Sequence, residues 1–418
     1  MSIQQNFPGF SPSLNLNFAR SKSLDQRVTF VRQTGATVTN ELGLLERVGN
    51  NIPRFDHVYD ASTRTVRSLG LLIEESRVNY ALRSQEFNLS PNSAINASIT
   101  PNAAIAPDGT LTADKLVEDN ISSTYKRVQQ GGFNVSGDYT VSFFVKEAGR
   151  YRGYIQLLNT TNASVSFNLQ DVSASGVVPS RTKIEPYPNG WYRVSTSHTF
   201  NAGETPTVYI VMMNDAGQVT YTGDGSSGLY IWGLQVEPGS FPTSYIPTTA
   251  LPTTRLADRA TIDGQNFSSW YNQIEGTYFM STKIAHTPNP TVSLLFRTAA
   301  TGGPRVSLEQ TTSNTLVGIV ENIGAYFFST SGSGLVPANQ FRKTSLSYIS
   351  TNGTTTVGAA TNLSTLVDTA SSTDVNKSMN TLYLGRYSDN AYYLNGHIQQ
   401  FVYYPRKISN TQLQQLTR

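Results

Sequence analysis

Apolar and polar residues alternate over many short segments of the chain, and this is the period of a β-strand that buries one face. The segment YTVSFFVK, for example, places Tyr139, Val141 and Phe143 on one face. The segments SVSFNLQDV, WYRVSTSHTF, TPTVYIVMM and GLYIWGLQVE continue the pattern, with no helical period between them. Strands at this spacing predict an antiparallel β-sandwich or jelly roll over residues 84–237. Its core is expected to include two tryptophans, Trp191 and Trp232.

A second group of strands follows in segments such as GTYFMSTKI, TVSLLFRTA, KTSLSYIS and GHIQQFVYYP. The chain closes with RKISNTQLQQLTR, in which Ser409 can cap a short helix that carries Leu413 and Leu416. We therefore expect an all-β protein with two antiparallel sandwiches in tandem, the second over residues 260–418.

The first part of the chain, residues 1–83, shows no sustained period. Its opening residues carry prolines and scattered asparagine and serine. The apolar segments RVTFVR and SLGLLIEESRVNYAL that follow are separated by glycines and Pro53. This region looks too short and too broken for a domain with its own core. We expect an irregular N-terminal attachment region that becomes ordered against a neighbour.

A proline-rich stretch over residues 238–259 separates the two predicted sandwiches. Proline has no N–H for a ladder hydrogen bond and holds the chain extended, so we expect a connector lying on a surface. The prolines recur every few residues, at Pro238, Pro242, Pro247 and Pro252. Three apolar residues of the connector are expected to pack along the first sandwich: Phe241, Tyr245 and Ile246.

Composition excludes several classes of protein. Charged residues make up 14% of the chain and the net charge is only +3, so nothing points to a nucleic-acid partner. No apolar stretch approaches the length of a membrane span, and the N-terminus lacks the pattern of a signal peptide. The absence of cysteine rules out disulfides, cysteine-based zinc sites and cysteine nucleophiles. We expect a protein made in the cytoplasm, without membrane insertion.

The sequence offers no catalytic constellation. Glycan hydrolysis usually needs two carboxylates on opposite sides of the sugar bond. The adjacent pair Glu74 and Glu75 would point to opposite faces of a strand, and the other carboxylates show no suitable spacing. The four histidines are scattered, without the spacing of metal ligands. We therefore predict that the chain is not an enzyme.

Calcium is the metal that the sequence could accommodate, through carboxylates near both ends of the first sandwich. In an antiparallel sandwich these ends can meet at one edge. The candidate ligands of such a structural calcium site are Asp108, Asp114 and Glu237. The alternative, which the Pro-Asp-Gly turn favours, is that Asp108 shapes the turn and the other carboxylates are solvated. No cofactor is certain.

Sugar recognition needs exposed aromatic rings flanked by hydrogen-bonding side chains. Two segments combine these residues, GRYRGYIQ at 149–156 and GRYSDNAYYLNG at 385–396. The candidate ligand-binding residues are Tyr151, Tyr154, Arg386, Tyr387, Asp389, Asn390 and Tyr392. The alternative is that these tyrosines are half-buried strand residues or contact a sister subunit.

Several motifs resemble known sequences. SLGLLIEESRVNYALRSQEF, APDGTLTADKL, NGWYRVS and GLYIWGLQVEPGSFPTSYIPTT resemble a module of bacteriophage tail, fibre and minor structural proteins. The middle domain of those proteins looks like a carbohydrate-binding-module jelly roll. GTYFMS and YLNGHIQQFVYYPRKISNTQLQQL make the last domain similar to a laminin-G/concanavalin-A-like sandwich. Together the resemblances cover residues 24–415.

The resemblance implies a virion protein that can face host glycans, although fold alone does not fix function. Our first hypothesis is a non-enzymatic tail fibre or receptor-binding component, attached to other virion proteins through residues 1–83. Homotrimers suit such a role because linked weak sites multiply affinity. The alternative is a head-decorating or tail-scaffold protein that binds only other virion proteins. A depolymerase with a parallel β-helix is disfavoured, because no turn-periodic repeat is present.

Overall fold

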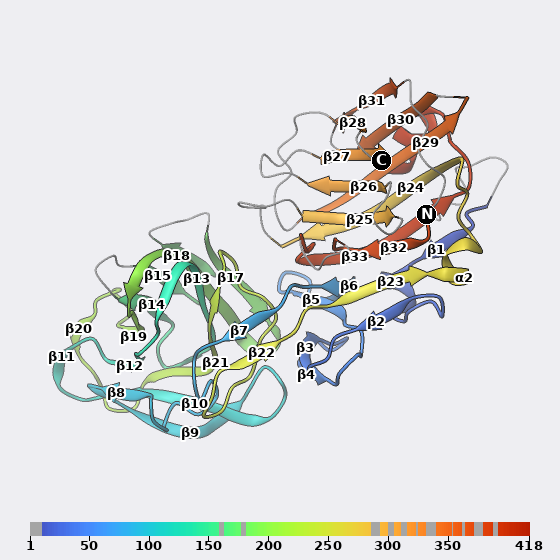
Figure 1. The fold of residues 1–418 in the computed structure, drawn as a ribbon. Coiled ribbons are helices and arrows are strands. Elements are labelled where there is room, and N and C mark those ends of the chain that lie inside the picture. Colours follow the sequence, from blue (N-terminus) through green and yellow to red (C-terminus); the bar gives the residue numbers. More distant parts are fainter. Residues whose placement is uncertain are drawn as a thin grey trace.

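The computed structural model describes most of the chain, and the described ranges are 11–158, 163–176, 181–285, 293–299, 305–310, 316–322, 325–331, 340–352, 354–361, 364–371, 379–387 and 392–418. Regular structure within these ranges is overwhelmingly antiparallel β-sheet, which confirms the predicted all-β class. The molecule has two lobes, and both ends of the chain lie in the same lobe (Figure 1). No helix in the described part of the chain is long and apolar enough to cross a membrane.

The smaller lobe is a sandwich of two six-stranded sheets. In spatial order, one sheet consists of β17 (Thr182–Tyr187), β18 (Trp191–Glu204), β13 (Val135–Ala148), β21 (Gly228–Pro238), β10 (Leu111–Glu118) and β9 (Ala97–Ile105). The other consists of β16 (Ser173–Gly176), β15 (Ala163–Asn168), β14 (Arg152–Leu158), β19 (Thr207–Met213), β12 (Arg127–Gln130) and β8 (Ser93–Ile95). Alternating apolar residues of both sheets fill the space between them, among them Val141, Phe143, Ile155 and Val165.

The larger lobe is a sandwich of an eight-stranded and a seven-stranded sheet. The first contains β31 (Ser364–Ser371), β30 (Thr354–Thr361), β29 (Phe341–Thr351), β24 (Glu275–Ile284), β33 (Gly396–Tyr404), β6 (Thr65–Ile73), β5 (Phe55–Asp60) and, beside β33, β1 (Leu14–Leu16). The second contains β2 (Thr29–Val31), β23 (Arg259–Asp263), β32 (Thr381–Leu384), β25 (Ser293–Ala299), β26 (Arg305–Gln310), β27 (Leu316–Asn322) and β28 (Ala325–Ser331).

Three two-stranded sheets, three short α-helices and a 3-10 helix at Pro188–Gly190 complete the described fold. The small sheets pair β3 (Ala36–Thr39) with β4 (Leu45–Val48), β7 (Arg77–Asn79) with β22 (Thr253–Arg255), and β11 (Ser122–Thr124) with β20 (Thr220–Thr222). The α-helices are α1 (Phe18–Ser21), α2 (Gly264–Ser268) and α3 (Asn410–Thr417). Ser409 caps α3 with a capping box, and Leu413 and Leu416 are buried, as predicted for this helix.

The larger lobe is discontinuous in sequence. Strand β1 pairs with the end of β33, with Leu14 opposite Tyr403, and β6 pairs with the start of β33 along the same edge. Strand β2 extends the second sheet beside β23. Leu16 and Phe18 are buried in the same core as Phe401. The two ends of the chain therefore build one sandwich, and the smaller lobe is inserted between them.

This arrangement corrects the prediction that residues 1–83 form an irregular attachment region. From Leu14 to Ile73 the chain supplies strands to the larger lobe. Those strands are short, and their hydrogen-bonding partners lie in the second half of the chain. Local periodicity cannot reveal such pairing, because each strand is stabilised by partners that are remote in sequence.

The proline-rich connector lies on the smaller lobe, as predicted. The side chains of Phe241, Tyr245 and Ile246 are only 7%, 1% and 3% exposed. Hydrogen bonds hold the backbone of Ile246 from both sides, because its N–H donates to Gln235 Oε1 at 2.7 Å and its carbonyl accepts from Asn79 Nδ2 at 2.8 Å. The connector is therefore fixed by side-chain contacts as well as by its prolines.

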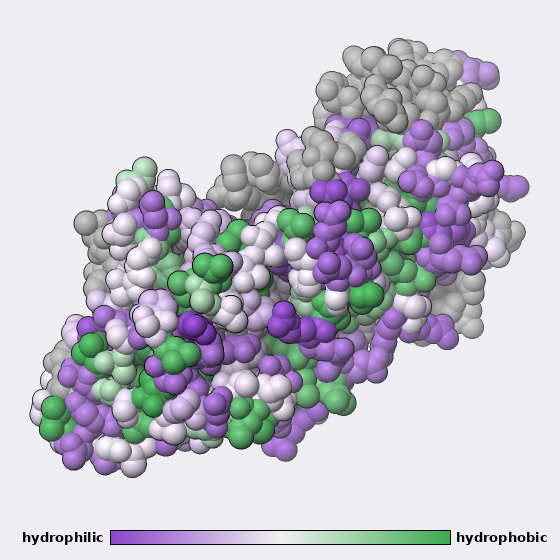
Figure 2. All heavy atoms as spheres, turned by 60° about the horizontal axis from the view of Figure 1, so that its bottom comes forward, coloured by the Kyte–Doolittle hydropathy of each residue, from purple (hydrophilic) through white to green (hydrophobic). Residues whose placement is uncertain are grey.

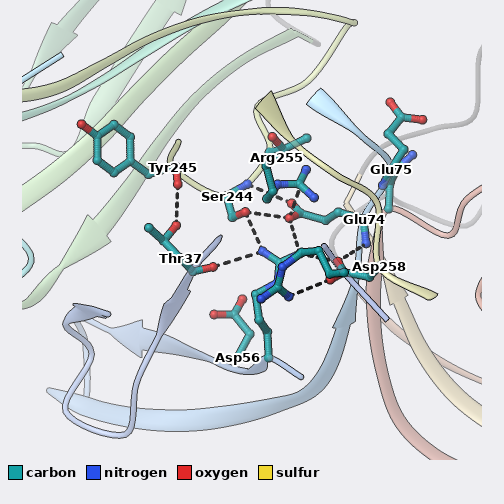
Figure 3. A network of polar contacts seen from close by, with 12 residues as sticks. Thr37, Asp56, Glu74, Glu75, Ser244, Tyr245, Arg255 and Asp258 are labelled. Atoms are coloured by element: carbon teal, nitrogen blue, oxygen red, sulfur yellow. Dashed lines mark hydrogen bonds and ion pairs between the residues drawn. The ribbon is translucent and has the colours of Figure 1, made fainter. Parts of the chain in front are cut away.

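A buried network of charged residues lies where the lobes meet (Figure 3). Arg54 and Asp258 are completely buried and form an ion pair, and Arg54 Nη2 also lies 2.8 Å from Glu74 Oε2. Arg32, which is also buried, contacts Asp258 Oδ1 at 3.0 Å. The backbone N–H of Glu74 donates to Asp258 Oδ2 at 2.9 Å. Glu74 follows β6, where the chain leaves the larger lobe, and Asp258 precedes β23, where it returns.

The same network holds the connector. Ser244 donates to the Glu74 carboxylate twice, from its backbone N–H at 2.8 Å and from its hydroxyl at 2.7 Å. Thr37 Oγ1 donates to the carbonyl of Tyr245 at 2.6 Å. Burial alone would raise the pKa of the Glu74 carboxyl, but Arg255, Arg54 and these hydrogen bonds outweigh it and hold that pKa far below its usual range. Glu74 is therefore a buried anion that fixes the two lobes relative to each other.

Replacing Asp258 by alanine should destabilise the protein strongly. Arg32 and Arg54 would lose a shared carboxylate, and breaking a buried ion pair from one side costs about 3–5 kcal/mol. The measurement is urea denaturation followed by tryptophan fluorescence. Asp263→Ala is the matched control, because Asp263 is exposed and makes no side-chain cap at α2; its effect should stay within about 0.5 kcal/mol. Equal effects of the two substitutions would contradict the role assigned to Asp258.

We call the buried network of Arg32, Arg54, Glu74 and Asp258 between the two lobes the joint. Acid should weaken this joint by protonating Glu74. Because its folded-state pKa is depressed, its stabilising contribution is complete above the ordinary value of 4.5 and is lost as pH falls below it. The free energy of unfolding should therefore drop more between neutral pH and about pH 3 in the wild type than in Glu74→Gln, which cannot titrate there. Parallel pH profiles for the two proteins would show that folding does not lower the pKa of Glu74.

Candidate functional site

Each exposed aromatic residue of this protein is a separate candidate for a ligand contact. On the face shown in Figure 2, hydrophobic side chains are interspersed with hydrophilic ones over both lobes. Among the described residues, two tyrosines are the most exposed aromatics, each 43% exposed: Tyr392 in the larger lobe and Tyr125 in the smaller one. Only Tyr392 lines a described groove.

That groove has a volume of about 360 Å³ and lies where the chain leaves and re-enters the larger lobe. One wall carries Gln33, which follows β2, and another carries Glu75 and Ser76, which precede β7. Leu256 belongs to the returning chain, which reaches β23 three residues later. The groove thus draws its walls from segments that the joint brings together.

Tyr392 adopts a backbone conformation that is rare for a bulky residue, with φ of 54°. Its ring meets the ring of Tyr387 edge to face, with the centroids 5.5 Å apart. Such conformations persist only where the surrounding structure holds them, and they concentrate at functional sites. The left-handed backbone and the edge contact orient the exposed Tyr392 ring at the groove.

Stacked arginines support this pair of tyrosines. The Arg297 guanidinium lies 3.9 Å from the centre of the Tyr387 ring, and that of Arg305 lies 5.3 Å from it. Arg305 also donates a hydrogen bond to the Tyr387 hydroxyl. One residue before Tyr387, the guanidinium of Arg386 lies 5.0 Å from the centre of the Tyr383 ring. Arginine packs well against aromatic faces, so these contacts hold the segment against the seven-stranded sheet.

The surroundings of the groove are cationic and partly desolvated. Burial lowers the pKa of Arg297 and of Arg386, although both remain charged at neutral pH. Burial raises the pKa of the Tyr393 hydroxyl, and the neighbouring Arg386 and Arg259 partly offset that rise. Among the described lining residues Glu75 is the only carboxylate, and it pairs with Arg77 at 2.6 Å. The groove therefore offers an aromatic face, a guanidinium, an amide and a hydroxyl.

The structure brings together part of the predicted ligand-binding set. Arg386, Tyr387 and Tyr392 meet at the groove and its supporting cluster, whereas Asp389 and Asn390 lie outside the described residues. In the smaller lobe, Tyr151 packs partly buried against the core, and its ring is 5.7 Å from the Arg152 guanidinium. Tyr154 is only 9% exposed, so sheet packing covers the ring that was expected to face a ligand.

The three predicted calcium ligands lie apart and are engaged otherwise. Asp114 is buried and accepts from the backbone N–H groups of Phe87 and Asn102, at 2.8 and 3.0 Å. Burial nevertheless raises its pKa. Asp108 shapes its turn by accepting from Thr110, which is the alternative that the turn sequence favours. In the described part of the chain, no three carboxylate or histidine side chains are grouped as metal ligands.

Glu237, the third of them, is buried at the end of β21. Its carboxylate accepts from the side-chain amide of Gln235 at 2.6 Å and from both the N–H and the hydroxyl of Thr243, at 2.9 and 2.6 Å. Glu237 therefore anchors the start of the connector.

Sequence reasoning missed the walls of the groove. Gln33, Glu75, Ser76, Leu256 and Arg259 belong to three segments that are far apart in the chain. No motif joins them. Only the insertion of the smaller lobe, which brings the departing and returning segments side by side, assembles them.

Comparisons with known proteins show weak structural similarities. No protein-family model and no curated protein sequence matches the chain. A carbohydrate-binding module (CBM40) of a Ruminococcus gnavus sialidase, bound to α2,3-sialyllactose, is 16% identical, with 37% of this chain and 88% of that one covered and a TM-score of 0.30. Mouse laminin α1 domains LG4–5 are 9% identical over 81% of this chain and 87% of theirs, with a TM-score of 0.23.

A tail fibre protein of an Escherichia coli phage is 11% identical, with 85% of this chain and 41% of that one covered and a TM-score of 0.19. Similarities this low carry no argument about what the chain binds. By its own strand arrangement, the chain is an all-β protein of two antiparallel sandwiches.

Removal of calcium should leave the stability of this protein unchanged, whereas removal of the Asp114 carboxylate should lower it. Asp114→Ala leaves the buried N–H of Phe87 and the part-buried N–H of Asn102 without this acceptor, at a cost of about 1–3 kcal/mol. Asp108→Ala removes only an exposed turn contact and should cost less. The measurement is thermal unfolding of the wild type and both variants, with calcium and with EDTA. A wild-type melting temperature that falls in EDTA would restore the calcium hypothesis.

Proposed function

We propose that this chain is a non-enzymatic glycan-binding protein that recognises sugars in the groove beside Tyr392. The observation that supports this most directly is an exposed tyrosine, held in a rare backbone conformation at the edge of a groove of about 360 Å³. An aromatic ring stacks on the apolar face of a pyranose, and Gln33, Ser76 and Arg259 supply hydrogen bonds to its hydroxyls.

The groove supports binding better than hydrolysis. Cleavage of a glycosidic bond by the usual route needs two carboxyl groups across the sugar bond. Of the described residues that line the groove, Glu75 alone is acidic, and it is held by Arg77. We therefore assign recognition, without bond cleavage, to this site.

The setting we propose is a bacteriophage virion, as a tail fibre or other receptor-binding component that faces host surface glycans. The motif resemblance supports this setting, and homotrimers would multiply a weak single-site affinity. Other virion proteins cannot bind residues 14–73 as a free arm, because these residues form core strands of the larger lobe. Electron microscopy of the particle would locate the chain and count its copies.

Tyr392→Ala should weaken binding to host lipopolysaccharide or capsule by about tenfold or more, because aromatic anchors dominate such contacts. Binding of the full chain is measured by glycan array and by biolayer interferometry on purified polysaccharide. The fold should be little affected, because Tyr392 lies at the surface and its described ring contact is with Tyr387 alone.

Tyr125→Ala is the matched control, since Tyr125 is equally exposed but lies on the smaller lobe. It should bind like the wild type. Loss of binding in Tyr125→Ala alone would move the site to the smaller lobe. Failure of the wild type to bind any host glycan would favour the scaffold role, in which the chain contacts only other virion proteins.

A further inference from the structure

A second cavity lies between the two lobes. It has a volume of about 240 Å³ and is open to the surface. Strand β17 of the smaller lobe forms one side, and β5 together with the ends of β24 and β33 forms the other. We call this cavity the crevice. It is separate from the groove at Tyr392, because the two share no described lining residue.

Some charged groups of the crevice are paired. His397 Nε2 lies 2.7 Å from Asp56 Oδ2, and the other oxygen of Asp56 accepts from the Thr39 N–H at 2.9 Å. Lys183 of the smaller lobe donates to the carbonyl of Ala285 in the larger lobe at 3.1 Å, and this bond crosses the crevice. The Lys183 hydrogen bond therefore ties the two sides of the crevice together.

Two opposite charges in the crevice remain without a partner within the described ranges. Lys283 lines it from β24 and Glu185 lines it from β17, and neither side chain makes an ion pair or a hydrogen bond within the described ranges. Burial lowers the pKa of the Lys283 amine, and the Glu185 carboxylate opposes that change. The two groups attract each other, yet they do not approach to ion-pairing distance, so the space between them is left for a bridging group.

Two histidines add hydrogen-bond acceptors beside this pair. His57 Nδ1 donates to the carbonyl of Thr39 at 3.0 Å, which leaves Nε2 of the neutral ring as an acceptor. His397 donates through Nε2 to Asp56, and in the neutral ring its Nδ1 is then an acceptor. The side chains are 6% and 8% exposed, and both remaining nitrogens are without a partner in the described part of the structure.

The lining therefore combines donors and acceptors at balanced charge. The charged side chains of the lining balance, because Lys183, Arg193 and Lys283 oppose Asp56, Glu74 and Glu185, so no excess of either sign selects an ion. A hydroxyl group accepts from an ammonium and donates to a carboxylate, so vicinal hydroxyls match this pattern. An anion would instead face the Glu185 carboxylate, and a cation would face Lys283.

We propose that the crevice is a second binding site, which takes an uncharged polyhydroxylated ligand of monosaccharide size. Its hydroxyls bridge Lys283 of the larger lobe and Glu185 of the smaller lobe. A ligand that contacts both lobes stabilises the folded protein and the joint together. This inference does not depend on the groove at Tyr392.

The test is isothermal titration calorimetry of the full chain with glucose, galactose and mannose. At least one sugar should bind saturably. Lys283→Met and Glu185→Gln should each weaken that binding about tenfold or more, because each removes a hydrogen bond to a charged group. Their melting temperatures without sugar should stay close to that of the wild type, since neither residue has a described partner to lose.

Two control variants separate the crevice from other sites. Lys115→Met removes a half-buried lysine of the smaller lobe that donates to the carbonyl of Ser226, and Tyr392→Ala disables the groove; both should leave the affinity for the monosaccharide unchanged. The proposal is overturned if none of the three sugars binds, or if Lys283→Met and Glu185→Gln bind as the wild type does. Loss of monosaccharide binding in Tyr392→Ala would also overturn it, because the sugar would then occupy the groove.

Discussion

Arg54 is fully buried where the two lobes meet, and its guanidinium contacts the carboxylates of both Glu74 and Asp258. A buried charge is tolerated only when its partners are held in place. Glu74 lies where the chain leaves the larger lobe, and Asp258 lies where it returns. The guanidinium of Arg54 therefore fixes both of the crossings, the two chain segments that connect the lobes. The pairing of β7 with β22 continues this constraint as a two-stranded ribbon.

Both proposed binding sites depend on this joint. Glu75 and Ser76 in the wall of the groove directly follow Glu74 in the chain, and Ala257 precedes Asp258. On the other side, Glu74 and Ser244 line the crevice. A change in the buried network would thus move the walls of both cavities, even though none of the network arginines needs to touch a ligand. Stability and recognition are coupled here through shared backbone.

Local sequence patterns predicted much of the fold, because strand alternation and helix capping are local properties. The buried rings of Trp191 and Trp232 and the capped helix after Ser409 followed from such patterns. The insertion of the smaller lobe could not be predicted from local patterns, because it depends on β1 pairing with β33 at the other end of the chain. The candidate site divides in the same way. The loop that carries Tyr387 and Tyr392 is recognisable from composition, whereas Arg259 and Gln33 reach the groove only through tertiary structure.

The connector shows why proline content alone did not explain the joint. Prolines restrict the backbone but leave its direction open. The direction is set by buried side chains, because Glu237 holds Thr243, Glu74 holds Ser244 and Gln235 holds Ile246. With two crossings and a network of buried hydrogen bonds, the lobes cannot rotate independently as they could on a single flexible linker. A fixed angle between lobes benefits a protein that presents several weak sites, since linked sites add affinity only when their geometry permits simultaneous contact.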